Sequence, residues 1–85
     1  MKYSVEILPR ALKELERIPD PFYRRIIGIV DGMKFEPRPS HTLKLKGHEY
    51  RWRIRVGDYR ILYEIHDTIK SVIVFRVVHR KEAYR

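Results

Sequence analysis

The chain has 85 residues, no cysteine and a formal net charge of +8. A chain of this length forms one domain with one modest core, which we place over residues 1–85. The lack of cysteine excludes disulfides and thiolate metal sites, so a cytoplasmic protein is expected. No apolar stretch approaches the roughly 18 residues of a membrane span. The positive charge favours an anionic partner, such as nucleic acid or an acidic protein.

The N-terminal segment predicts a strand followed by a helix. Residues 2–8 alternate polar and apolar side chains, as in a short strand. Pro9 suits the first turn of a helix, where its missing N–H costs nothing. The apolar residues that follow recur at helical spacing: Ala11, Leu12, Leu15 and Ile18. Pro19 ends this helix.

A second helix is predicted over residues 21–35. Asp20 is expected to cap its N-terminus, and Pro21 is expected to be its first residue. The short break between the two helices indicates an αα-hairpin. Residues 36–40 contain two prolines and are expected to form a loop.

The C-terminal half predicts an antiparallel β-meander. Residues 43–46 alternate as a short strand, and residues 50–56 and 59–65 form two strands joined by a Gly-Asp turn. Residues 71–79 are apolar on both faces, which is typical of a central strand covered on both sides. The order β-α-α-β-β-β, which counts the strands of the meander from residue 50 onward, defines an α+β fold with the helices packed on one face of the sheet.

Arginines occupy one face of the first hairpin strand. Side chains alternate along a strand, so Arg51, Arg53 and Arg55 point the same way. Arg60 follows just across the predicted turn. A row of guanidinium groups suits an anion, and phosphate is the leading candidate. The alternative is a solvated basic face without a ligand.

Neighbouring segments supply further candidate side chains. Histidine is a common proton-transfer residue, so His79 is a candidate for that role, although a histidine that only packs is an equal alternative. The sequence contains no phosphate-binding glycine loop, no nucleophile motif and no histidine spacing typical of metal ligands, so no metal or cofactor is expected. The added candidates are Lys44, Lys46, Arg76, His79, Arg80 and Tyr84.

Taken together, these residues resemble the RelE/ParE superfamily of toxins from bacterial and archaeal toxin–antitoxin pairs. The resemblance spans essentially the whole chain. Its carriers are PRALKEL at residues 9–15, LKG at 45–47, WRIRVGDYRILYE at 52–64 and VVHRKEAY at 77–84.

The resemblance implies two possible activities. RelE-like members are ribosome-dependent mRNA endonucleases, whereas ParE-like members inhibit DNA gyrase and lack the nuclease residues. By position, Arg60, Arg80 and Tyr84 resemble nuclease residues, and Arg53 and Arg55 stand where some members carry lysines. The intact C-terminal motif favours the RelE-like branch.

We therefore expect a translation-inhibiting endoribonuclease that acts on ribosome-bound mRNA through the RNA 2′-hydroxyl without a metal. A cognate antitoxin is expected to neutralise it in a hetero-oligomer, and the free toxin is expected to be a monomer without membrane contact. The alternatives are a gyrase inhibitor without nuclease activity and a non-catalytic RNA- or ribosome-binding module.

Proton transfer is the least defined step of this reaction. Arginine, with a pKa above about 12, stabilises charge but is a poor base. Arg53 and Arg55 therefore suit charge stabilisation. The base is left open among four residues of the chain (Lys44, Lys46, His79 and Tyr84) and groups of the ribosome or the substrate.

Overall fold

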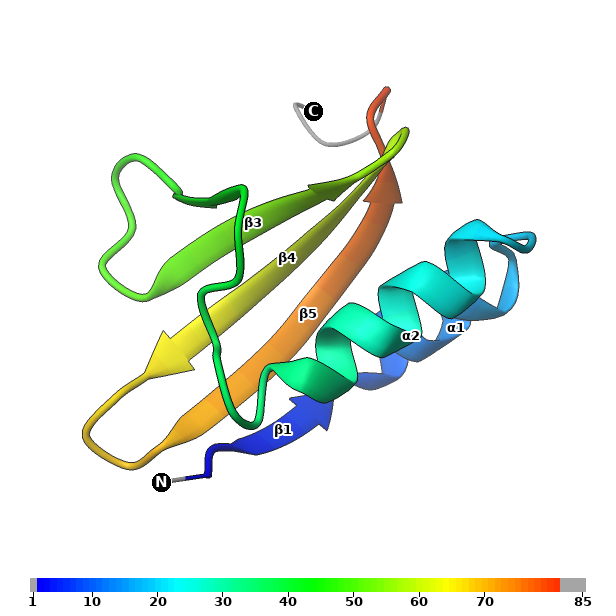
Figure 1. Ribbon diagram of the computed structural model, residues 1–85. Helices are drawn as coiled ribbons and strands as arrows, with labels where there is room; N and C mark the ends of the chain where they lie inside the picture. Colours follow the sequence, from blue (N-terminus) through cyan, green and yellow to red (C-terminus); the bar gives the residue numbers. More distant parts are fainter. Residues whose placement is uncertain (1, 82–85) are drawn as a thin grey trace.

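The computed structural model describes residues 2–81 of the chain, and Figure 1 shows two helices packed against a sheet. Tyr84, one of the predicted site residues, lies outside the described residues. Among residues 2–81 no helix is long and apolar enough to cross a membrane. The elements in chain order are β1 (Ser4–Ile7), α1 (Pro9–Glu16), α2 (Phe22–Gly32), β2 (Thr42–Lys44), β3 (Arg51–Val56), β4 (Tyr59–His66) and β5 (Ser71–His79).

The five strands form one sheet in the order β1-β5-β4-β3-β2. Consecutive strands from β2 to β5 pair antiparallel, which confirms the predicted meander. The first strand differs, because β1 pairs parallel with β5, with Ser4 opposite Ser71. The helical hairpin therefore links the two edge strands of a mixed sheet (Figure 1). The α+β class and the strand–helix–helix start are confirmed.

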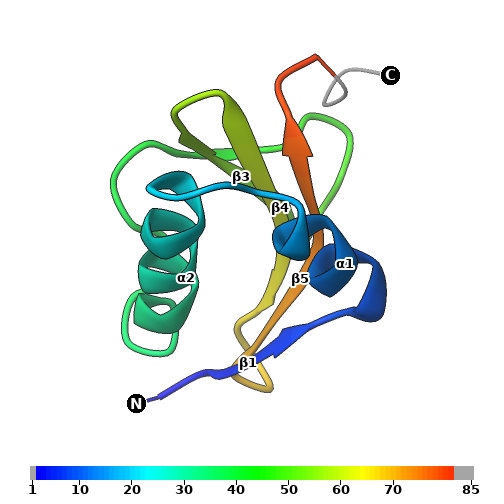
Figure 2. The ribbon, with the colours of Figure 1, turned by 90° about the vertical axis from the view of Figure 1, so that its right-hand side faces the viewer.

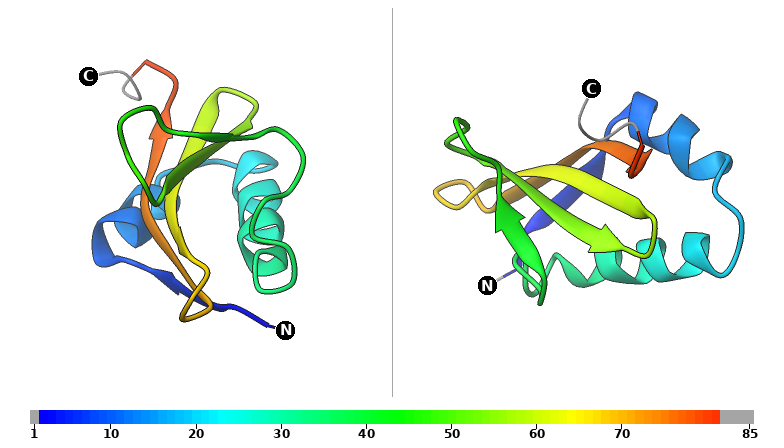
Figure 3. Two further views of the ribbon diagram at one scale, coloured as in Figure 1. Left: turned by 90° about the vertical axis from the view of Figure 1, so that its left-hand side faces the viewer. Right: turned by 90° about the horizontal axis from the view of Figure 1, so that it is seen from above.

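Both helices bury their apolar side chains against one face of this sheet. Ala11 and Leu15 of α1 and Ile26 and Val30 of α2 join a single core cluster with strand residues such as Tyr63. The first helix contacts β5 and the second contacts β3, so the hairpin spans the sheet (Figures 2 and 3). Each large side chain buried in this way stabilises the fold by about 1.5–3 kcal/mol. The helices leave the other face of the hairpin strands to charged side chains.

The helix ends differ in detail from the sequence prediction. Pro9 is at the start of α1 as expected, but Asp20 does not cap α2. The N-cap residue is Pro21, and the Asp20 carboxylate lies 3.5 Å from the Nε atom of Arg24. The second helix ends at Gly32, before the predicted Phe35, because the chain tightens into hydrogen bonds between residues three apart.

The last strand is covered less completely than its composition suggested. Hydrogen-bonded neighbours flank β5 on both sides where β1 runs beside it. However, Ile73 and Phe75 are only half-buried on the face away from the helices. The guanidinium carbon of Arg51 lies 4.6 Å from the centre of the Phe75 ring. The prediction of a central strand is confirmed, but a charged side chain, and not a second layer, shields the outer face of β5 at Phe75.

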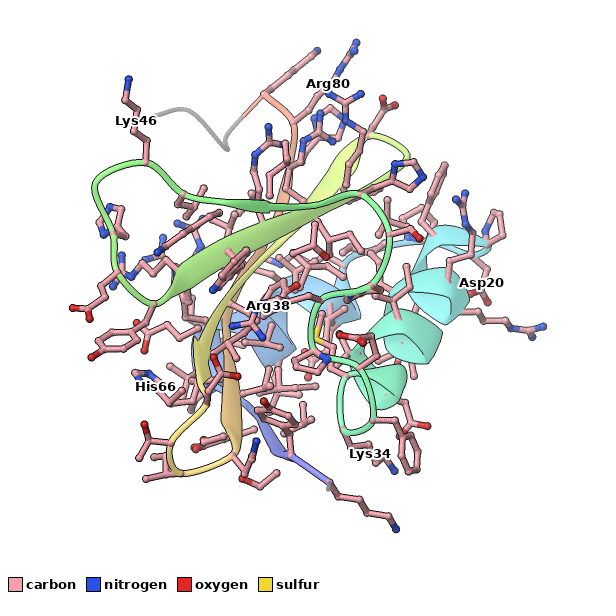
Figure 4. The ribbon with its side chains drawn as sticks, turned by 60° about the vertical axis from the view of Figure 1, so that its left-hand side comes forward. Asp20, Lys34, Arg38, Lys46, His66 and Arg80 are labelled. Atoms are coloured by element: carbon pink, nitrogen blue, oxygen red, sulfur yellow. The ribbon has the colours of Figure 1, made fainter. Side chains whose placement is uncertain are left out.

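The loop between α2 and β2 is tied to distant parts of the fold. The Tyr63 hydroxyl donates a hydrogen bond of 2.9 Å to the carbonyl oxygen of Pro37. Arg38 donates through both terminal nitrogens to the Asp67 carboxylate, and its guanidinium carbon lies 4.7 Å from the centre of the Trp52 ring. These contacts hold the loop across the sheet and set where β2 begins (Figure 4).

Candidate functional site

A groove of about 520 Å³ lies beside the arginine face of β3. Its lining residues are His41, Leu43, Arg53, Arg55 and Gly57. The pairing of β2 with β3 builds this groove, because Leu43 is directly opposite Arg53 and opposed residues share one face of a sheet. The groove thus joins residues from two strands and the following turn.

The β3–β4 hairpin positions one end of the groove. Val56 is opposite Tyr59, and Gly57 has a φ of +58°, as the predicted two-residue turn requires. A Cβ atom at Gly57 would lie 2.6 Å from the ring of Phe22. Glycine is therefore needed at this position both for the backbone conformation and for the close approach of α2.

The three arginines of β3 share one face as predicted, but they differ in their partners. The Nε atom of Arg51 lies 3.3 Å from Oε2 of Glu64. Hydrogen bonds from His66 and Arg51 hold the pKa of the Glu64 carboxyl below its ordinary value. By contrast, the ion pairs within residues 2–81 do not include Arg53 or Arg55. The groove therefore contains two cations with no carboxylate partner in the described chain.

Arg60, a candidate nuclease residue by its resemblance to the family, is buried in the hairpin. It is opposite Arg55 in the hairpin, yet only 4% of its surface is exposed. Its Nη1 atom donates to the carbonyl oxygens of Gly57 and Tyr59 at 3.2 and 2.9 Å, and its Nε atom is buried without a partner. In this conformation Arg60 supports the turn from within, and contact with a phosphate requires its side chain to rearrange.

The two candidate residues at the end of β5, His79 and Arg80, lie in different environments. Arg80 is exposed beside the hairpin turn, where its backbone N–H donates to the carbonyl oxygen of Asp58 at 2.6 Å. Its Nε atom lies 3.7 Å from the Asp58 carboxylate. His79 is half-buried and packs edge-to-face on Tyr59, with 5.5 Å between ring centres. Because Tyr59 belongs to the core cluster, His79 lies on the helix side of the sheet, away from Arg53.

The remaining predicted cations are scattered. The Arg76 guanidinium is held by the Glu14 carboxylate, with an Nη2–Oε2 distance of 2.9 Å. Lys44 is opposite Trp52, so it faces away from the groove, and its ammonium lies 5.9 Å from the centre of the Trp52 ring. Lys46 projects outward from the loop after β2, and Arg80 projects from the end of β5 (Figure 4). The predicted RNA-binding set therefore does not form one continuous surface.

His41 lines the groove but was not among the predicted site residues. No local pattern indicated it, because His41 lies one residue before β2 and has a φ of +73°, so strand alternation does not extend to it. The pairing of β2 with β3 brings it to the groove that Arg53 and Arg55 line.

This fold, with a basic groove beside a tight antiparallel hairpin, defines a small α+β protein suited to an anionic macromolecule. A family model described as the ParE toxin of type II toxin–antitoxin system, parDE, matches residues 5–84. The chain therefore belongs to the RelE/ParE family of toxins from toxin–antitoxin systems, which confirms the resemblance seen in the sequence.

Individual relatives agree with this assignment. The toxin RelE3 of Methanocaldococcus jannaschii is 38% identical over 81 residues, covering 86% of this chain and 85% of that protein. The toxin RelG of Mycobacterium tuberculosis is 31% identical, covering 100% of this chain and 99% of that protein. The archaeal RelE–RelB complex from Pyrococcus horikoshii OT3 contains a chain with a TM-score of 0.84 and 31% identity, covering 98% of this chain and 100% of that chain.

Proposed function

We propose that this toxin is a ribosome-dependent mRNA endoribonuclease neutralised by a cognate antitoxin. The observation that carries the proposal is the groove in which Arg53 and Arg55 lie without a carboxylate partner among residues 2–81. Two relatives that are at least 30% identical carry the names RelE3 and RelG. These names favour the RelE-like activity over the gyrase-inhibiting one.

The proposed reaction needs no metal, because the two arginines supply the positive charge. The 2′ oxygen of a ribose attacks the adjacent phosphorus, and the P–O5′ bond breaks. The products are a 2′,3′-cyclic phosphate and a free 5′-hydroxyl. Negative charge on the phosphate oxygens is greatest in the transition state, and fixed guanidinium groups stabilise it there more than in the substrate.

Other cations are proposed to hold the RNA around the reacting phosphate. Arg80 lies beside the same hairpin turn as Arg55 and is exposed. Lys46 extends from the neighbouring loop (Figure 4). Each such side chain strengthens binding to the phosphate backbone of the RNA, and this contribution weakens as the salt concentration rises. Tyr84 remains a candidate catalytic residue on the basis of the sequence resemblance alone.

The antitoxin completes the proposal. The net charge of +8 favours association with an acidic polypeptide. The solved relative from Pyrococcus horikoshii is a complex of RelE with RelB. A protein of this type bound to the toxin would keep the basic groove from RNA in the resting cell.

Cleavage on programmed ribosomes tests the nuclease assignment. Wild-type toxin is expected to cut mRNA in the presence of a metal chelator, with a 2′,3′-cyclic phosphate on the upstream product. The double variant Arg53→Ala/Arg55→Ala is expected to fold normally and to lose at least about 100-fold in rate. Uncut mRNA with wild-type toxin on ribosomes of the native host would refute the activity. Binding without cleavage would instead identify a non-catalytic ribosome-binding module.

A second candidate is inhibition of DNA gyrase, which the description of the matching family model as a ParE toxin favours. A supercoiling assay with purified gyrase separates the two activities. The nuclease assignment predicts unchanged supercoiling at toxin concentrations that stop translation. If supercoiling is inhibited and the mRNA stays intact, the protein is a gyrase inhibitor and the nuclease assignment is wrong.

A further inference from the structure

His41 has an unusual backbone conformation at the entrance to the groove. It is exposed, directly precedes β2 and has a φ of +73°. Residues other than glycine seldom adopt this left-handed conformation, although histidine does so more often than most. Such conformations persist only where the surrounding structure imposes them, and they cluster at functional sites. The conformation therefore calls for a functional explanation of this residue.

Contacts on both sides of His41 impose its conformation. Before it, the Pro37 carbonyl oxygen accepts a hydrogen bond from the buried Tyr63 hydroxyl. After it, the Thr42 N–H donates to the Pro39 carbonyl oxygen at 3.2 Å, and the Thr42 hydroxyl lies 3.3 Å from the Tyr63 hydroxyl oxygen. The loop is thus fastened to one buried side chain at two points. His41 is held between them.

The pairing of β2 with β3 ends next to His41. Its last pair is Thr42 opposite Ile54, and the next residues outward along the two strands are His41 and Arg55. His41, Arg53 and Arg55 all line the groove, together with Leu43 and Gly57. The other charged side chains among these described lining residues are the two arginines of β3, and the described lining includes no carboxylate.

The chain has four histidines, all within residues 2–81, and three of them are placed elsewhere. His66 is hydrogen-bonded to the Glu64 carboxylate at 2.9 Å. His79 packs on Tyr59 on the helix side of the sheet. His48 is exposed in the loop between β2 and β3. His41 is therefore the one histidine that lines the groove with Arg53 and Arg55, which have no carboxylate partner among residues 2–81.

Among the described residues that line the groove, no other side chain is suited to proton transfer. Guanidinium groups do not give up a proton near neutral pH. A neutral imidazole can accept a proton. His41 supplies the chemical function that the two arginines cannot perform.

We propose that His41 is the general base of RNA cleavage, an inference that rests on the proposed nuclease activity. One imidazole nitrogen takes the proton of the 2′-hydroxyl as the 2′ oxygen bonds to phosphorus. The P–O5′ bond then breaks, its electron pair stays on the 5′ oxygen, and that oxygen takes a proton from water. Arg53 and Arg55 hold the phosphate during these steps.

The test compares variants that keep the left-handed backbone but remove the imidazole. His41→Asn and His41→Gly suit this conformation, since asparagine and glycine tolerate a positive φ. Both variants are expected to keep the wild-type melting temperature and ribosome affinity. Both are expected to cleave about 100- to 10,000-fold more slowly under single-turnover conditions. His48→Asn is the matched control and is expected to cleave like the wild type.

Two further measurements separate proton transfer from a structural role. Free imidazole is expected to restore part of the activity of His41→Gly but not that of Arg55→Ala. The wild-type rate is expected to rise with pH towards neutrality and then level, and this rise is expected to be absent in His41→Asn. Wild-type rates in both His41 variants would overturn the proposal while leaving the nuclease assignment intact. A slow variant without imidazole rescue and with the wild-type pH profile would also overturn it.

Discussion

Arg55 and Arg60 are directly opposite each other in the β3–β4 hairpin, but their guanidinium groups have different roles. Arg55 is exposed and lines the groove. Arg60 is buried and donates to two carbonyl oxygens of the turn beside it. One arginine of the pair is therefore enclosed in the hairpin turn, and the guanidinium group of the other is accessible in the groove.

This difference predicts opposite effects of two alanine substitutions. Arg55→Ala is expected to slow RNA cleavage with a change of less than about 0.5 kcal/mol in the free energy of unfolding, as at other exposed sites. Arg60→Ala is expected to lower that free energy by about 1–3 kcal/mol, because turn carbonyl groups lose their buried donor. Urea denaturation and single-turnover cleavage measure the two effects. If Arg60→Ala keeps full stability and loses cleavage, Arg60 must reach the RNA.

Gly57 provides a test of the hairpin geometry. Gly57→Ala is expected to destabilise the fold by more than about 1 kcal/mol, because of its positive φ and the nearby ring of Phe22. Gly28 lies within α2, and apart from its chain neighbours and the backbone of its own helix, no described atom lies within 4 Å of where its Cβ would be. Gly28→Ala is therefore expected to stabilise the protein by about 0.5–1 kcal/mol. Thermal denaturation of both variants measures the two changes in stability. If Gly57→Ala were as stable as Gly28→Ala, the described conformation of the turn would be contradicted.

The ion pair between Arg38 and Asp67 predicts a dependence of stability on acid pH. Hydrogen bonds from Arg38 and Tyr3 lower the pKa of Asp67 from 3.8 to about 2. A carboxyl group whose pKa is lowered by folding stabilises the fold at pH values above its ordinary pKa. This contribution is lost as the pH falls towards 2. Wild type is therefore expected to be more stable than Asp67→Asn at pH 5, with the difference shrinking between pH 4 and 2. Denaturation curves across this range would contradict the assignment if the difference stayed constant.

Glu14 joins α1 to the part of β5 that β1 does not reach. Its carboxylate accepts hydrogen bonds from the Arg76 side chain and from the backbone N–H of Val77, both at 2.9 Å. Glu14→Ala leaves both donors without this acceptor and is expected to destabilise the fold by about 1–2 kcal/mol. Glu16→Ala, at an exposed position of the same helix, is the control and should change stability by less than about 0.5 kcal/mol. Urea denaturation measures both, and a similar change in the two variants would mean that the hydrogen bonds from Glu14 to β5 add nothing to stability.

Local sequence patterns predicted most of the elements because their causes are local. Alternating side chains in residues 51–56 and the Gly-Asp turn specified the hairpin, its register and the shared face of Arg53 and Arg55. The helix boundaries were less accurate, since Asp20 pairs with Arg24 in place of capping α2. End residues depend on small energy differences between competing hydrogen bonds.

By itself, the sequence determined the α+β class, the antiparallel hairpin and the arginine row of β3, because strand alternation and turn chemistry act over a few residues. Only the tertiary structure decided which charges are available to a ligand. Arg76 is neutralised by Glu14, a residue 62 positions away in the chain. Likewise, pairing of β2 with β3 brings His41 to the groove. Such pairings depend on how distant segments pack, and no local pattern encodes them.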